Sequence, residues 1–179
     1  MRVIVTVAAL LAWVVPLHAA PRHIFNQSSG VWPVGFSYFC MENPARCEPL
    51  APGSSTEMIS LSRWIDRLEE VNSKVNASIT YREEEVDHWD IAPPAGDCDD
   101  FAITKREALA AMGLSRGVMP LAFVLTDHYG SHVVLLINTT DGYMVLDNLT
   151  NEVYHLDQMI VHRLSIQDPA KPRNWTQIF

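Results

Sequence analysis

The strongest constraint on the fold is a change in hydrophobic spacing near Gly113. From Met58 to Val75 apolar residues recur at intervals of three and four, which predicts an amphipathic helix with Ser54, Ser55 or Thr56 as N-cap. A second helix is predicted from Asp97 to Gly113. Beyond it, turn residues separate short apolar runs, which predicts hairpin-linked strands over residues 119–126, 132–137, 143–147 and 153–156.

The first 19 residues have the pattern of a secretory signal peptide. Arg2 precedes an apolar run from Val3 to Val15, and Ala19 and Ala20 supply the small residues that a signal peptidase requires. The run is shorter than the roughly 20 apolar residues of a membrane span. We therefore expect residues 1–19 to be removed and the mature protein to be periplasmic or secreted, without a membrane span, in a compartment that permits disulfides.

Residues 20–55 are rich in proline and glycine, and we expect them to form a loosely ordered N-terminal arm before one domain over residues 56–179. Within the arm, Cys40 and Cys47 enclose six residues. A disulfide between them would contribute about 2–3 kcal/mol by loop entropy, and we predict this pairing. Two free cysteines, or a bridge that involves Cys98, are the alternatives.

The charge of the chain excludes one class of partner. Lys and Arg number 13 against 21 Asp and Glu, for a net charge of -8, and no basic run is present. Phosphate groups would be repelled, which argues against a nucleic acid or an anionic membrane as partner. Cations are better suited, although the acidic stretch from Glu83 to Asp90 is expected to be a solvated loop.

Cys98 falls at the start of the second predicted helix, with Asp97 as N-cap. A helix N-terminus lowers a thiol pKa and offers unpaired backbone N–H groups that could bind an oxyanion, as a nucleophile requires. However, Asp97, Asp99 and Asp100 oppose a thiolate, because one unit charge at about 6 Å raises the thiol pKa by about two units. A nucleophilic Cys98 therefore needs a cation such as Ca2+, or a protonated histidine, beside it. Otherwise Cys98 is an inert residue of an acidic, capped helix.

The hairpin after residue 132 supplies a histidine and a carboxylate. If Asn138 to Asp141 form a four-residue loop, Ile137 pairs with Gly142, Val134 faces Val145, and His132 faces Asp147. A two-residue loop of Asp141 and Gly142 would instead separate His132 from Asp147 by about 13 Å. In the first register, Cys98, His132 and Asp147 could act as nucleophile, base and orienting carboxylate. His128 and His155 remain rival bases, and Asn148 remains a rival orienter.

The sequence resembles the bacterial transglutaminase-like cysteine proteinases over about half of its length. The resemblance runs from Val75-Asn76 through Gly96-Asp97-Cys98-Asp99-Asp100-Phe101-Ala102 and Lys105 to His132-Val133-Val134-Leu135-Leu136 and Val145-Leu146-Asp147-Asn148. It implies an α+β fold of the papain-like/transglutaminase-like class, with the nucleophile at a helix N-terminus packed on an antiparallel sheet that carries the histidine and the aspartate. It also implies that Cys98 is the nucleophile, His132 the general base and Asp147 the orienter.

The resemblance has further implications for metal and partners. Some members of the family are calcium-dependent periplasmic proteases that cleave large surface adhesins and so release cells from biofilms. In those members, acidic residues beside the cysteine help to bind Ca2+, and Asp97 and Asp99 occupy the matching positions here. Asp99 stands where those proteases commonly carry Glu. A surface adhesin as protein substrate and an inner-membrane receptor as partner are implied in the same way.

The expected activity is that of a cysteine endopeptidase, which hydrolyses an amide through a thioester on Cys98. Transfer of the same thioester to an amine, as in transglutaminases, is the nearest alternative. A non-catalytic module of the same fold, which binds a peptide or a receptor in the same cleft, is an alternative of another class.

Overall fold

The structure is a computed structural model that describes residues 33–54 and 56–178. The predicted signal peptide, residues 1–19, and the first part of the predicted arm lie outside the described residues. Two helices, α2 (Leu61–Ser78) and α3 (Cys98–Ala111), precede most of the strands. The helical pattern thus predicted both helices, although α2 begins after Ser60 rather than after residues 54–56.

A six-stranded antiparallel sheet forms the second layer of the molecule. Its strand order is β6-β5-β4-β3-β7-β8. The strands are β3 (Leu121–Thr126), β4 (Gly130–Thr139), β5 (Gly142–Leu146), β6 (Tyr154–His155), β7 (Arg163–Gln167) and β8 (Trp175–Gln177). The first four were predicted, whereas β7 and β8 were not. Short 3-10 turns lie at Pro44–Arg46, Arg116–Val118 and Leu156–Gln158.

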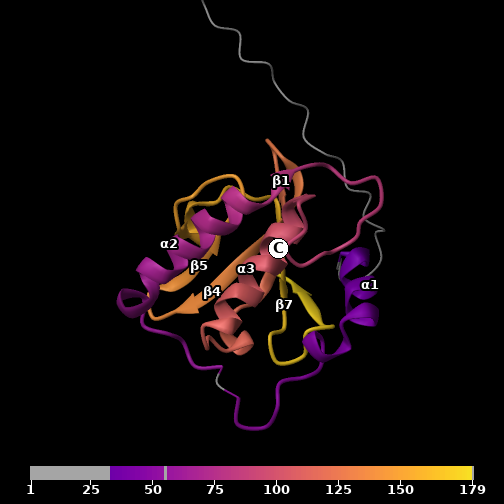
Figure 1. Cartoon of the computed structure of the whole chain (residues 1–179). Coiled ribbons are helices and arrows are strands. Elements are labelled where there is room, and N and C mark those ends of the chain that lie inside the picture. The colour runs from indigo at the N-terminus through magenta and orange to yellow at the C-terminus, as the bar shows by residue number, and fades with distance from the viewer. Residues whose placement is uncertain (1–32, 55, 179) are drawn as a thin grey trace, which may run out of the picture.

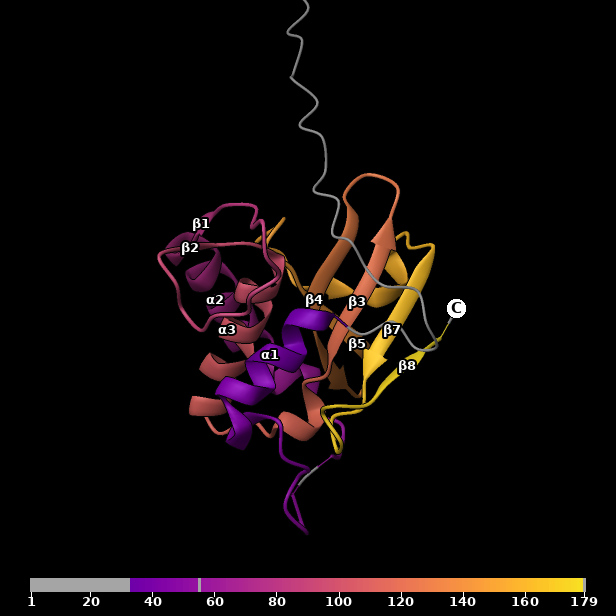
Figure 2. The ribbon, with the colours of Figure 1, turned by 90° about the vertical axis from the view of Figure 1, so that its right-hand side faces the viewer.

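The helices all lie on one face of this sheet (Figures 1 and 2). Alternate strand residues pack against them, among them Phe123, Leu135 and Leu146, which are fully or almost fully buried. The intervening residues form a smaller core on the opposite face, where residues of β6 and of the segment that follows it cover the sheet. Among the helices of the described ranges, none is both long and apolar enough to cross a membrane.

The described part of the predicted arm is ordered, in contrast to our expectation. Helix α1 (Val34–Glu42) buries Phe36, Phe39 and Cys40 in the main core, and Phe36 packs edge-on against Trp89 with ring centroids 5.2 Å apart. The Cys40–Cys47 disulfide is present as predicted, with Cα atoms 5.4 Å apart. The prolines prevent a long helix but not a short one, and burial of aromatic side chains holds this segment to the domain.

Hydrogen bonds also hold the acidic loop after α2 in place. The Asp87 carboxylate accepts hydrogen bonds from the Gly35 backbone N–H at 2.8 Å and from Trp89 Nε1 at 2.9 Å. Two short parallel strands, β1 (Thr80–Tyr81) and β2 (Ala95–Gly96), close the base of this loop. Because β2 ends directly before α3, the loop fixes where that helix begins.

Candidate active site

Cys98 is the first residue of α3, and the start of this helix is held by a buried carboxylate. Asp100 Oδ2 accepts from the Asp97 backbone N–H at 3.1 Å, and Asp100 Oδ1 accepts from the Asp90 N–H at 2.6 Å. Gly96 lies so close that a Cβ there would be 1.8 Å from Asp100 Oδ2. Burial raises the pKa of Asp100 to about 7. The aspartate that sequence reasoning treated only as a first-turn charge therefore organises the helix start.

The Cys98 thiol is free and buried, and its sulfur contacts β4, the first strand of the predicted hairpin. The Val133 backbone N–H donates to Cys98 Sγ at 3.4 Å. Cys98 and His132 line one small cavity, together with Pro33, Asp87, Asp99, Ser131 and Val133. The structure thus places Cys98 next to His132, the histidine of the predicted hairpin.

His132 is buried and contacts the predicted carboxylate. Its Nε2 lies 2.8 Å from Asp147 Oδ1. This contact engages one ring nitrogen and leaves Nδ1 as the nitrogen that can serve a thiol. The rival residues are placed elsewhere: His128 is exposed in the β3–β4 turn, and His155 lies on β6, where it pairs with Met144 of β5. The Asp147 carboxylate, rather than the Asn148 amide, contacts the ring.

The strand register behind this contact differs from both registers that we considered. Thr139 pairs with Gly142 and Leu135 pairs with Leu146, so the loop consists of Thr140 and Asp141 alone. The predicted pairing of Ile137 with Gly142 is therefore wrong. Gly142, with φ of +108°, adopts a conformation that favours glycine and allows the tighter turn.

The wrong register still gave the right face of the sheet. In the observed register, continuation of β5 by one residue sets Asp147 opposite Val134 rather than opposite His132. A shift of two residues leaves every side chain on its predicted face, because side chains alternate with a period of two. His132 and Asp147 are therefore diagonal neighbours, which long polar side chains can bridge.

Three further groups fix Asp147, and sequence reasoning missed two of them. Tyr154 Oη donates to Asp147 Oδ2 at 3.0 Å, and the Leu149 N–H donates to Oδ1 at 3.1 Å. Asn76 Nδ2 on α2 donates to the Asp147 carbonyl at 3.0 Å and to Thr150 O at 2.9 Å. Charge and hydrogen bonds from His132 keep the pKa of Asp147 low despite its burial. Asn76 and Tyr154 were the missed residues, although Asn76 lies within the quoted resemblance.

A buried lysine lies behind this group. Lys105 is fully buried on α3, its Nζ lies 5.8 Å from the centre of the Phe101 ring, and it has no hydrogen-bond partner among the described residues. Burial lowers the pKa of Lys105 to about 7, and the negative charge of Asp147 opposes that shift. Like Asn76, Lys105 belongs to the residues that carry the family resemblance, and its burial was not predicted from the sequence.

The surroundings of Cys98 in the structure disfavour a thiolate, as the sequence predicted. Burial, then the charges of Asp99 and Asp97, raise the pKa of Cys98 well above its ordinary value, and the hydrogen bond from Val133 only partly counters them. A thiolate at Cys98 therefore requires additional positive charge.

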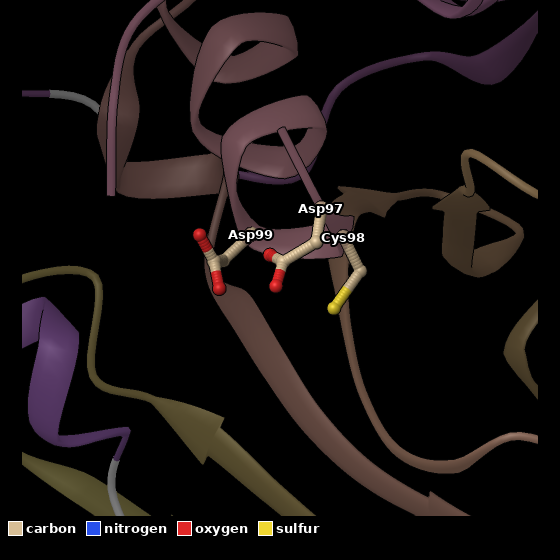
Figure 3. Close-up of side chains that lie close together, drawn as sticks. All are labelled: Asp97, Cys98 and Asp99. Atoms are coloured by element: carbon tan, nitrogen blue, oxygen red, sulfur yellow. The ribbon is translucent and has the colours of Figure 1, made fainter. Parts of the chain in front are cut away.

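The carboxyl groups of Asp97 and Asp99 could hold that charge as a cation. Both residues are buried, and one oxygen from each lies within 4.8 Å of the other and of Cys98 Sγ. Figure 3 shows the two carboxyl groups and the sulfur on the same side of the helix start. Asp99 Oδ1 is buried without a hydrogen-bond partner among the described residues, and burial beside Asp97 raises the pKa of Asp99 well above its usual value. Ionised carboxylates are ligands that Ca2+ prefers, and a Ca2+ ion held by Asp97 and Asp99 would take further ligands from water or backbone carbonyls.

Comparison with known proteins bears on both the fold and the family. The family model of the bacterial transglutaminase-like cysteine proteinases matches residues 26–179. No curated protein matches the chain. Calcium-bound LapG from Legionella pneumophila is similar at 23% identity, with a TM-score of 0.50, over 56% of this chain and 64% of the other. EGTA-treated LapG is similar at 20% identity, with a TM-score of 0.51, over 64% of this chain and 72% of the other. These likenesses show the shared fold and confirm the predicted α+β class.

Proposed function

Because the chain belongs to the bacterial transglutaminase-like cysteine proteinases, we propose that it is an exported cysteine endopeptidase that uses Cys98, His132 and Asp147. The observation that carries the proposal is the buried contact of His132 Nε2 with Asp147 Oδ1 at 2.8 Å, next to the backbone N–H that binds Cys98 Sγ. A base that is oriented on one side and faces a thiol on the other is what nucleophilic catalysis requires.

In the proposed reaction, His132 Nδ1 accepts the Cys98 proton and the sulfur attacks the carbonyl carbon of an amide. Backbone N–H groups at the start of α3 hold the oxyanion of the tetrahedral intermediate. His132 then gives its proton to the leaving amine, the C–N bond breaks, and a thioester remains on Cys98. Water, deprotonated by His132, attacks the thioester, which releases the carboxylic acid and restores the thiol. Asp147 holds the imidazole ring and stabilises its protonated form throughout.

Alkylation of Cys98 tests the activated pair without knowledge of the substrate. With Ca2+ present, we expect iodoacetamide to label Cys98 at neutral pH faster than it labels a free thiol, and we expect His132→Gln to slow that labelling by at least tenfold. His128→Gln, which changes an exposed histidine of the neighbouring turn, is the matched control and should label at the wild-type rate. Labelling of the wild type no faster than a free thiol would instead favour a non-catalytic binding module.

Product analysis separates hydrolysis from transfer to an amine. Peptides from an accepted protein substrate should carry one added water at the new carboxyl end, and Cys98→Ala should form none of them. Incorporation of an added primary amine in place of water would identify a transglutaminase-type reaction. A Cys98→Ala variant with full activity would end the proposal for either reaction.

We further propose that Asp97 and Asp99 hold Ca2+. The two oxygens and the sulfur within 4.8 Å of one another support this site, as does the calcium-bound state of the similar LapG structure. A bound Ca2+ would neutralise the carboxylates that oppose the thiolate. Excess EGTA should lower both the melting temperature and the labelling rate of Cys98, and Ca2+ in excess over the chelator should restore both. No change in either quantity would argue against a functional calcium site.

The proposal also includes export of the protein and the identity of its substrate. Residues 1–19 are proposed as a signal peptide, and the Cys40–Cys47 disulfide is compatible with an oxidising compartment. On the resemblance to adhesin-cleaving members of the family, we propose a large surface adhesin as substrate and an inner-membrane receptor as regulator. N-terminal sequencing of the protein from a periplasmic extract should begin near Ala20. A retained Met1 would contradict cleavage.

A further inference from the structure

A second cavity of about 230 Å3 shares no lining residue with the one beside Cys98. It lies between the loop that contains Cys47, the middle of α3 and the segment after β7. Three arginines line it, Arg46, Arg106 and Arg116, although the chain as a whole is acidic. Such a concentration of guanidinium groups around one cavity calls for a chemical explanation.

Arg106 is the buried member of the group. Its side chain is 3% exposed, and its Nη1 donates to Gln167 Oε1 at 3.0 Å. Within the described part of the chain, Nε and Nη2 have no hydrogen-bond partner. The nearest carboxylate oxygen, Glu107 Oε1, lies 3.9 Å from Nε, which is too far for a hydrogen bond. Among the described residues, the Nε–Nη2 edge of this buried guanidinium therefore makes an ion pair with Glu107 but no hydrogen bond.

The neighbouring acid is already engaged by the two other arginines. Glu107 Oε2 accepts from Arg46 Nε at 3.1 Å and from Arg116 Nη2 at 2.6 Å, and Glu107 Oε1 accepts from Arg116 Nε at 3.2 Å. Of the charged residues that line the cavity, three are arginines and one is the exposed Glu48, and with Glu107 counted beside them one positive charge remains in excess. Gln167 Oε1 cannot accept more, because it accepts from Arg106 Nη1 and from the Leu121 backbone N–H, and Gln167 Nε2 donates to Pro172 O.

We propose that this cavity binds a small oxyanion, a carboxylate or inorganic phosphate, on the Nε–Nη2 edge of Arg106. Two parallel N–H donors match the spacing of two oxygens on one carbon or phosphorus, which is why arginine recognises these groups in a bidentate manner. Binding would also relieve the cost of a buried and incompletely paired charge. The Cys40–Cys47 disulfide contributes to the site, because it fixes the loop from which Arg46 reaches Glu107.

Thermal unfolding of the full-length chain with Cys98→Ala, which prevents any self-cleavage, tests the proposal. Sodium phosphate and sodium acetate are titrated separately against sodium chloride at constant ionic strength. One of the two oxyanions should raise the melting temperature saturably, by about 4–7 °C at twenty times its dissociation constant. The arm that responds identifies the oxyanion as phosphate or carboxylate.

Arg106→Gln should abolish the rise, whereas Arg63→Gln, on the exposed face of α2, should retain it. If Arg106→Gln fails to fold, Arg46→Gln at the half-exposed wall should weaken binding at least fivefold in isothermal titration calorimetry. An oxyanion response in the wild type no greater than that of chloride overturns the proposal. So does an undiminished response in both Arg106→Gln and Arg46→Gln.

Discussion

Replacement of Lys105 by methionine should stabilise the protein at acidic pH and do so progressively less as the pH rises. The Lys105 ammonium is buried, and its pKa falls from 10.5 in the unfolded chain to about 7 in the folded one. Between these values the unfolded chain binds a proton that the folded chain does not bind, so the stability of the wild type rises with pH across this window. The whole shift corresponds to about 5 kcal/mol.

The difference between the variant and the wild type isolates this effect from other titrating groups. The pKa of Asp100 is raised to about 7, so its contribution to the free energy of unfolding falls as the pH rises toward 7, but this happens in both proteins. From the two pKa values of Lys105, the advantage of Lys105→Met should be about 3 kcal/mol larger at pH 6.5 than at pH 9.5. Methionine fills a similar volume without a charge, so packing changes little.

Urea unfolding at pH 6.5, 8.0 and 9.5 measures the difference directly. Lys74→Met is the matched control, because Lys74 is an exposed lysine of α2 that pairs with Glu70 at the surface. Its free energy difference from the wild type should be nearly constant over this range. A change of less than 1 kcal/mol for Lys105→Met between pH 6.5 and 9.5 would refute a buried amine with a strongly lowered pKa.

Three further substitutions address how the site is held. Asn76→Ala removes the amide that binds the Asp147 carbonyl and should cost about 2–3 kcal/mol in urea unfolding; a loss below 0.5 kcal/mol would contradict this role. Gly96→Ala should displace the Asp100 carboxylate and cost at least about 2 kcal/mol by the same assay, and an unchanged melt would exclude the close approach. Tyr154→Phe removes a hydrogen-bond donor that helps to lower the pKa of Asp147, so this pKa should rise. In a plot of the Cys98 alkylation rate against pH, the fall in rate on the acidic side should begin at a higher pH in this variant. An unshifted fall would show that the hydrogen bond from Tyr154 to Asp147 does not affect the site.

The elements of the domain could be predicted from sequence because each long element carries a local pattern. Helix α3 has its acidic first turn and Gly113 at its end, and β3 to β5 are continuous apolar runs. Strands β7 and β8 carry no such signal. They are short, polar at several positions, and paired to one another at one edge of the sheet, so only the β3 edge explains why they form.

The candidate site was predictable for a different reason. Side-chain alternation fixes the face on which a strand residue lies, so His132 and Asp147 could be assigned to one face even though their exact pairing was wrong. The contacts of Asn76 and Tyr154 with Asp147 span 71 and 7 residues of sequence. No local pattern encodes the first of these contacts, because it depends on how α2 packs beside the loop after β5.

The charges at the start of α3 explain why the site would need both a histidine and a cation. Asp100 accepts hydrogen bonds on both of its oxygens, and these bonds hold the helix start. Among the described residues Asp99 Oδ1 has no hydrogen-bond partner, and burial, then the charges of Asp99 and Asp97, raise the pKa of Cys98. In the proposed reaction His132 takes the thiol proton, which leaves the two carboxylates next to the new thiolate. A bound Ca2+ would lower the cost of the negative charge that develops on the sulfur. Proton acceptance and charge compensation are therefore separate requirements, which the proposed roles of His132 and of the Asp97–Asp99 pair meet separately.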